Sequence, residues 1–207
     1  MNIYYFVSNP KYIEKYDFSD LIKSNKSISD IQKEIQSIPD FCRDQQSIAT
    51  NELKSYLVSG ISFFTENTNK QITGLANFDI NQDKLNIIGI CIPTANKGNG
   101  TIIINEIKKF GILNNIKEIR LTCYGDVKNF YEKLNFVVID QSILYNSDDE
   151  DEDSEDEMKG KIRYEMMFKL KEHEKHKIIS GGKTKKRKSI KKRKSTKKRK
   201  KRKSTKK

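Results

Sequence analysis

Two glycines and the lysine before them are the first residues whose types and spacing could do chemistry. Lys97, Gly98 and Gly100 stand between an apolar run that ends at Ile92 and a second one that begins at Thr101. Glycine in such a turn permits a positive φ and a close approach of the backbone to a ligand. The helix that follows would offer unpaired N–H groups and the positive end of its dipole, and both attract phosphate. An ordinary glycine-containing turn has the same pattern, and neither a Walker loop nor a full GxGxxG is present.

Tyr131 is the second chemical candidate, in the segment Phe130-Tyr131-Glu132-Lys133-Leu134. Val127, Phe130, Tyr131 and Leu134 recur at helical spacing and predict an amphipathic helix. Asp126 is a suitable N-cap for this helix. Asn135 follows its last turn, where a left-handed residue often stands. The tyrosine is therefore either a core aromatic or a phenol that can donate a proton.

The elements that must position these residues alternate between strand and helix. A mixed α/β (α+β) sheet of about seven strands with flanking helices is predicted. Strands are expected at Asn2–Val7, Leu57–Thr65, Gln71–Ile80, Leu85–Ile92, Ile116–Cys123, Phe136–Leu144 and Ile162–Leu170. A loose amphipathic helix is expected to start near Pro10 and to include Tyr12, Ile13, Tyr16 and Leu21. Further helices are expected at Ser29–Ile38, at Thr101–Leu113 and after Asp126.

Connection lengths decide how the central strands pair. Tight turns at Asn67–Asn69 and Asn81–Asp83 join three strands into an antiparallel meander. A helix then carries the chain back, so the strand at Ile116–Cys123 must run parallel to the one at Leu85–Ile92.

Charge is segregated along the 207 residues, which carry a formal net charge of +13. Residues 183–207 contain 18 Lys or Arg and no acid, so the rest of the chain is at −5. Nine of the ten residues 148–157 are acidic. We therefore expect a folded domain over 1–172 with an acidic loop insertion at 147–157, and a disordered basic tail over 173–207.

The three cysteines, Cys42, Cys91 and Cys123, have no zinc-binding spacing, so no metal is expected. The N-terminus lacks the features of a signal peptide, and no apolar run reaches the roughly 20 residues that span a bilayer. A soluble protein in a reducing, intracellular setting without membrane contact is the simplest interpretation.

Together, the turn and the tyrosine helix resemble the GCN5-related N-acetyltransferases, the GNAT family. That family has a signature of the form [RQ]-x-x-G-x-[GA], which here is Ala95-Asn96-Lys97-Gly98-Asn99-Gly100. It also commonly carries a FYEKLGF-like stretch, which here is Phe130 to Phe136. The resemblance covers about residues 1–170 in element order and about 85–137 in motif. Ala95 departs from the usual Arg or Gln, and Tyr124 from the Asn of many relatives.

The resemblance implies an acetyl-CoA-dependent N-acetyltransferase that acts by direct attack of an amine. Pantetheine would pair with the backbone of Ile90, Cys91 and Ile92, and pyrophosphate would bind the amides of Asn96, Lys97, Gly98, Asn99, Gly100 and Thr101. Tyr131 would be the general acid, and Cys123 a buried small hydrophobe. The general base stays open among Glu66, Asp79, Asp83 and ordered water, because both histidines lie beyond the last strand.

The basic tail supports a second interpretation. Lys and Arg clusters bind nucleic acid through phosphate charge and resemble nuclear localisation signals. The tail also resembles those of giant DNA virus proteins, which indicates a nuclear or virion-associated location. The alternative function is thus a catalytically inactive GNAT-fold protein that binds nucleic acid or a virion. If it is an enzyme, the acceptor is open among protein lysine, an N-terminal amine, a polyamine and a small amine.

Overall fold

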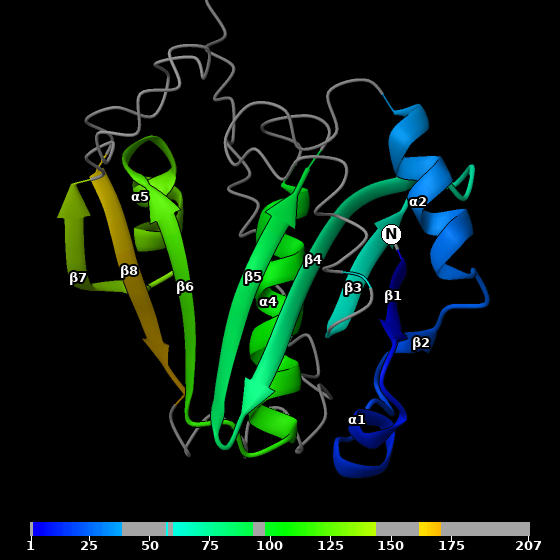
Figure 1. The fold of residues 1–207 in the computed structure, drawn as a ribbon, viewed down its shortest axis with the longest axis horizontal. Helices are drawn as coiled ribbons and strands as arrows, with labels where there is room; N and C mark the ends of the chain where they lie inside the picture. Colours follow the sequence, from blue (N-terminus) through cyan, green and yellow to red (C-terminus); the bar gives the residue numbers. More distant parts are fainter. Residues whose placement is uncertain (1, 39–56, 58–59, 93–97, 144–161, 171–207) are drawn as a thin grey trace, which may run out of the picture.

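A mixed sheet of eight strands forms the centre of the fold (Figure 1). The computed structural model describes residues 2–38, 57, 60–92, 98–143 and 162–170. The strands lie in the order β2-β1-β3-β4-β5-β6-β8-β7. Their bounds are β1 Asn2–Val7, β2 Ile22–Lys23, β3 Ile61–Glu66, β4 Ile72–Asn81, β5 Lys84–Cys91, β6 Glu118–Tyr124, β7 Val137–Ile143 and β8 Ile162–Lys169.

Strand directions follow the connections between them. β3, β4 and β5 pair antiparallel, as the two tight turns predict. β5 and β6 pair in parallel, which confirms the expectation from the intervening helix. β8 pairs antiparallel with β6 on one side and with β7 on the other, which completes the sheet. The predicted mixed architecture is therefore confirmed, with one strand more than the approximate count.

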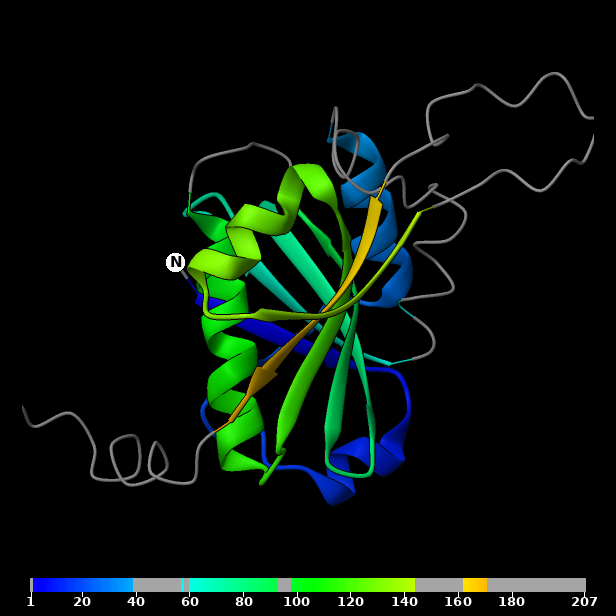
Figure 2. The ribbon, with the colours of Figure 1, turned by 90° about the vertical axis from the view of Figure 1, so that its left-hand side faces the viewer.

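Helices cover both faces of this sheet. α1 spans Pro10–Lys15, α2 Ile28–Ser37, α4 Asn99–Leu113 and α5 Gly125–Lys133. α4 and α5 lie on one face, and α2 lies on the other (Figure 2). Two groups of buried side chains correspond to these two faces.

The main core lies between the sheet and α4. Its α4 side chains include Ile103, Ile104, Ile107 and Phe110, all at most 2% exposed, as the helical spacing predicts. The second core lies beneath α2, whose Ile31 and Ile35 meet apolar residues of β3, β4 and β5. Its buried members are Ile31, Ile35, Leu57, Phe64, Ile72, Leu75 and Cys91.

Several predicted boundaries are wrong. Asp126 is not an N-cap, because β6 runs directly into α5 and Tyr124 takes the cap position. Asp126 stands in the first turn, where its Oδ1 accepts a bond from the N–H of Val127. β3 begins at Ile61 rather than Leu57, whose side chain packs in the second core. The two-residue strand β2 was not predicted, since two residues carry no periodic signal.

The end of α5 matches its prediction. Asn135 has a φ of 64°, so it takes the expected left-handed conformation. The N–H of Phe136 then reaches the carbonyl of Tyr131 at 3.1 Å, and that of Asn135 reaches Glu132 at 2.8 Å. This pair of bonds is the Schellman arrangement, which closes the helix and turns the chain towards β7.

The predicted acidic insertion at 147–157 and the basic tail at 173–207 lie outside the described residues, as does the boundary at residue 172. Among the helices that are described, none combines the length and apolar character needed to cross a membrane.

Candidate active site

β5 and β6 separate part-way along their length. Their parallel register runs from Lys84 opposite Glu118 to Ile87 opposite Leu121. Within the described lengths of the two strands the pairing ends there, and the ribbons diverge towards their C-terminal ends (Figure 1). The other edge of β5 stays paired with β4 as far as Cys91. Beyond Ile87, no described strand pairs with the edge of β5 that faces β6.

A β-bulge marks the point of separation. Asn77 of β4 pairs with Gly89 and Phe78 pairs with Ile87, which leaves Ile88 as the extra residue. A bulge switches the side-chain alternation of its strand. Leu85 and Ile87 accordingly point into the main core before the bulge, and Ile90 and Ile92 pack against it afterwards.

Gly98 begins the helix that follows β5. It occupies the N-cap position of α4 with a φ of 76°, and a Cβ built on it would meet no heavy atom within 4 Å. A residue with a Cβ is strained at this φ even where there is space. Gly98 is also exposed, so the N-cap of α4 lies at the surface.

The N-terminus of α4 differs from those of the other described helices. α1 has the side chain of Asn9 as a cap, and α2 has a capping box of Ser27 and Asp30. α5 has an acid, Asp126, in its first turn. Of the four helices described, only α4 has neither a side-chain cap nor an acidic first turn. Its first N–H groups and dipole are therefore available to an anion.

Gly100 lies in close contact with α5. A Cβ at this position would lie 3.1 Å from Cζ of Phe130 on α5 and 3.8 Å from Cγ1 of Ile92. The first turn of α4 is thus fitted between the end of β5 and the helix that carries Tyr131.

Tyr131 lies on α5, which packs against β6 and β8. Its side chain is 5% exposed, and its ring packs edge-on against Phe130 at 5.0 Å and Phe136 at 5.8 Å between centroids. Burial raises the pKa of the phenol well above its usual value, and the Cys123 thiol raises it further. The phenol therefore stays protonated at physiological pH, which is the state that a proton donor needs.

Cys123 is fully buried on β6, two residues beyond the last pair with β5. Its Sγ lies 3.4 Å from Sδ of Met166. Burial raises the pKa of the thiol to about 11, so the nucleophilic thiolate is disfavoured. Its predicted role as a small hydrophobe is confirmed.

The three acids considered as general bases are in different situations. Glu66 forms an ion pair with Lys26 at 2.8 Å, and Asp83 forms one with Lys117 at 2.6 Å at the far end of β5. Asp79 stands opposite Asn86 in the β4–β5 pair, one residue before the last β5–β6 pair. One oxygen of its carboxylate is buried without a hydrogen-bond partner. Burial is the main cause of a raised pKa of the Tyr12 phenol, and the Asp79 carboxylate raises this pKa further.

The predicted cofactor residues fall into three groups. Ile90, Cys91 and Ile92 lie at the end of β5 beside the opening. Gly98, Asn99, Gly100 and Thr101 form the cap and first turn of α4. Asn96 and Lys97 lie outside the described residues, with the rest of 93–97. The Cys91 sulfur takes part in a disulfide, whereas the sequence favours a reducing setting.

Sequence reasoning missed a contact made by Asn99. The residue is 4% exposed, and its Nδ2 donates to the carbonyl of Thr73 on β4 at 2.9 Å. No periodic or motif signal indicates this bond, because its partner is a backbone atom of a distant strand.

The arrangement suits a ligand that combines an extended, amide-bearing arm with a phosphate group. The edge of β5 that faces β6 would pair with the arm, and the first turn of α4 would hold the phosphates. Among the described residues, no three His, Cys, Asp or Glu side chains gather where they could hold a metal ion.

Solved structures with this architecture include acetyltransferases. The ribosomal-protein-S18-alanine N-acetyltransferase from Escherichia coli superposes with a TM-score of 0.55 over 71% of this chain and 92% of its own, at 12% identity. The chain has the fold of the GNAT acetyltransferases. One such acetyltransferase, from Streptococcus pneumoniae, matches with a TM-score of 0.52 at 16% identity, over 72% of this chain and 98% of that one. No model of a protein family matches the sequence, and no curated protein does.

Proposed function

We propose that the protein transfers an acetyl group from acetyl-CoA to a primary amine. The observation that carries this proposal is the parallel β5–β6 pair that separates after Ile87 and leads into an uncapped α4. The edge of β5 beyond its last pair with β6 would bind the pantetheine half of coenzyme A, and the N-terminus of α4 would bind the pyrophosphate half. The GNAT fold at low identity supports the same class of ligand.

Binding would use the backbone more than the side chains. Ile90, Cys91 and Ile92 offer N–H and C=O groups to the amides of the pantetheine arm. The amides of Gly98 to Thr101 would hold the pyrophosphate. Because these contacts come from the main chain, they tolerate side-chain changes such as Ala95 in the signature.

Acetyl-CoA supplies an activated thioester, and the residues of this chain manage the protons. The amine nitrogen forms a bond to the acetyl carbon, the C–S bond breaks, and its electron pair leaves on sulfur. Tyr131 gives its proton to that sulfur as the charge develops. The amine loses a proton to Asp79, which among the described residues is the one of the three acids with no ion pair, or to ordered water. Cys123 takes no part.

Calorimetry and thermal melting of the full chain with acetyl-CoA test the proposal. At a ligand concentration about 100 times Kd, binding should stabilise the protein by about 2.7 kcal/mol. For a domain of this size this is a rise in Tm of about 5–10 °C. 3′-Phosphoadenosine diphosphate, which has the pyrophosphate but no arm, should bind more weakly. Absence of heat and of any thermal shift with millimolar acetyl-CoA would refute the proposal.

Release of free coenzyme A thiol with a panel of acceptors then defines the substrate. The panel needs a lysine peptide, a peptide with a free N-terminus, a polyamine and a small amine, because any of these presents the required nucleophile.

The basic tail favours a second function, binding of nucleic acid. Its 18 positive charges in residues 183–207 would release counterions from a phosphate backbone. Affinity for duplex DNA should fall steeply with salt and disappear when the tail is removed. Binding that persists without the tail would contradict this assignment.

A further inference from the structure

Asn99 is a buried polar residue at the first position of α4. It is 4% exposed, so its amide must find partners inside the protein. Its Nδ2 donates to the carbonyl of Thr73 at 2.9 Å, which joins the start of α4 to β4. The residue thus sits between the two glycines of the turn and faces away from the opening, towards the sheet.

Thr73 is itself an irregular position. Thr65 of β3 pairs with Gly74 and Glu66 pairs with Ile72, so Thr73 is the extra residue of a β-bulge. The extra residue of a bulge leaves the regular ladder. Its carbonyl is the acceptor for Asn99, and its Oγ1 lies 3.0 Å from Oγ1 of Thr65.

Close packing surrounds the same point. A Cβ on Gly74 would lie 2.9 Å from Cδ1 of Ile92 and 2.9 Å from Cδ1 of Ile103. The end of β5 and the first turns of α4 therefore press directly on β4 beside the bulge. A shift of the bulge would move the surface on which α4 begins.

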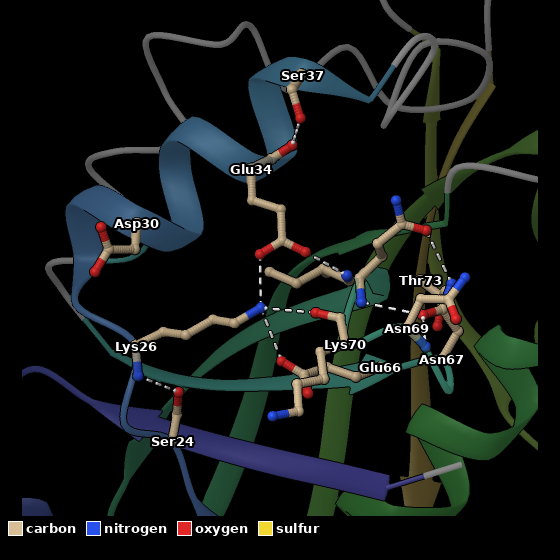
Figure 3. Close-up of polar contacts among 12 residues, drawn as sticks. Ser24, Lys26, Asp30, Glu34, Ser37, Glu66, Asn67, Asn69, Lys70 and Thr73 are labelled. Atoms are coloured by element: carbon tan, nitrogen blue, oxygen red, sulfur yellow. Dashed lines mark hydrogen bonds and ion pairs between the residues drawn. The ribbon is translucent and has the colours of Figure 1, made fainter.

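A cluster around Lys26 holds Glu66 and Ile72, the pair of residues on one side of the bulge (Figure 3). Lys26 Nζ lies 2.8 Å from Oε1 of Glu66 and 2.6 Å from Oε2 of Glu34. The other oxygen of Glu34 accepts the N–H of Ile72 at 2.6 Å. Lys26 Nζ also donates to the carbonyl of Lys70 at 3.0 Å in the β3–β4 turn. The cluster ties α2 and the segment before it to the β3–β4 hairpin.

We propose that Asn99 is a positioning residue that fixes the first amides of α4 against the bulge at Thr73, and that the Lys26 cluster holds this bulge in place. The inference rests on the proposed function, since those amides are the expected pyrophosphate site. It predicts that residues outside the coenzyme A site control its affinity through the bulge.

The variant pair Asn99→Ala and Asn114→Ala tests this in the full chain. Asn114 is the matched control, because it is the same residue type at the other end of α4 and donates to the carbonyl of Asp17 at 2.9 Å. Asn99→Ala should raise the Kd and the KM for acetyl-CoA about tenfold, since Thr73 loses its partner. Its kcat at saturating acetyl-CoA should stay within about twofold, and Asn114→Ala should change the Kd by less than about twofold.

Hydrogen exchange without ligand gives a second readout. The N–H of Ile102 bonds the carbonyl of Gly98 at 3.1 Å in the first turn of α4. The amides of Ile102 to Ile104 should exchange faster in Asn99→Ala than in Asn114→Ala. If Asn99→Ala does not fold, Asn99→Ser replaces it.

Equal exchange in the two variants, or equal affinity for acetyl-CoA, would overturn the inference. If the wild type binds no acetyl-CoA, the proposed function fails, and the exchange comparison alone decides whether Asn99 positions the first turn of α4.

Discussion

Replacing Tyr131 with Phe isolates the phenol from the ring that carries it. The ring packs at 5.0 Å from Phe130 and 5.8 Å from Phe136, and these contacts survive the change. The free energy of unfolding should therefore change by less than about 1 kcal/mol. Proton donation by a positioned side chain contributes about 10²–10⁴ to a rate. We expect kcat to fall by that factor, with the KM for acetyl-CoA nearly unchanged.

The pH dependence adds a check on the same group. Burial keeps the pKa of the phenol high, so the wild-type rate should show no loss through ionisation of Tyr131 below about pH 10. The high pKa also makes the phenol a weak acid in the resting protein. Its effect must therefore arise with the charge that develops on sulfur, an interaction present only in the transition state.

Tyr16→Phe is the control for this experiment. Tyr16 is 8% exposed in the main core, and its hydroxyl is buried without a partner. Losing that hydroxyl should leave the rate unchanged and the stability equal or slightly higher. A Tyr131→Phe enzyme with a kcat within about threefold of wild type would refute the assignment of Tyr131 as the acid.

Three further predictions concern the turn, the base and the bulge. Gly98→Ala should lower the free energy of unfolding by about 1–2 kcal/mol because of its positive φ, and it should weaken acetyl-CoA binding. Gly100→Ala should lower the stability less. Thermal melting measures the stability, and calorimetry measures the binding. Asp79→Asn should lower kcat by about 10²–10⁴ if its carboxylate is the base, whereas Asp83→Asn should leave it unchanged in the same assay. Lys26→Met should lower the free energy of unfolding by roughly 2 kcal/mol. This loss is below the usual 3–5 kcal/mol for breaking a buried ion pair, because the Lys26 side chain is 26% exposed. Lys26→Arg should restore most of the lost stability. An unchanged denaturant midpoint for Lys26→Met would show that the cluster does not hold the bulge.

Periodicity predicted most of the fold. The spacing of apolar residues identified the buried face of α4, and the two tight turns identified the meander. The parallel direction of β6 followed from the helix before it. These features could be predicted because each depends on local sequence or on the length of a connection.

The features that shape the candidate site could not be predicted in this way. The bulge at Ile88 changes which residues of β5 face the core, yet the apolar run from Leu85 to Ile92 looks the same with or without it. The bulge at Thr73 and the bond from Asn99 likewise depend on which strands become neighbours. Asp126 was misplaced for a related reason, since β6 leads into α5 without an intervening loop.

Gly98 and Gly100 meet different physical demands, although the motif treats them alike. Gly98 has the positive φ and empty space around it, so its backbone conformation, and not its packing, favours glycine. Gly100 has no positive φ, and Phe130 sits 3.1 Å from where its Cβ would be. A methyl group there needs a shift of only a few tenths of an ångström, which agrees with the Gly-or-Ala choice at that place in the GNAT signature. Phe130 belongs to the second motif, directly before Tyr131. The Gly98–Gly100 turn and α5 are therefore one packing unit, and each helps to place the other.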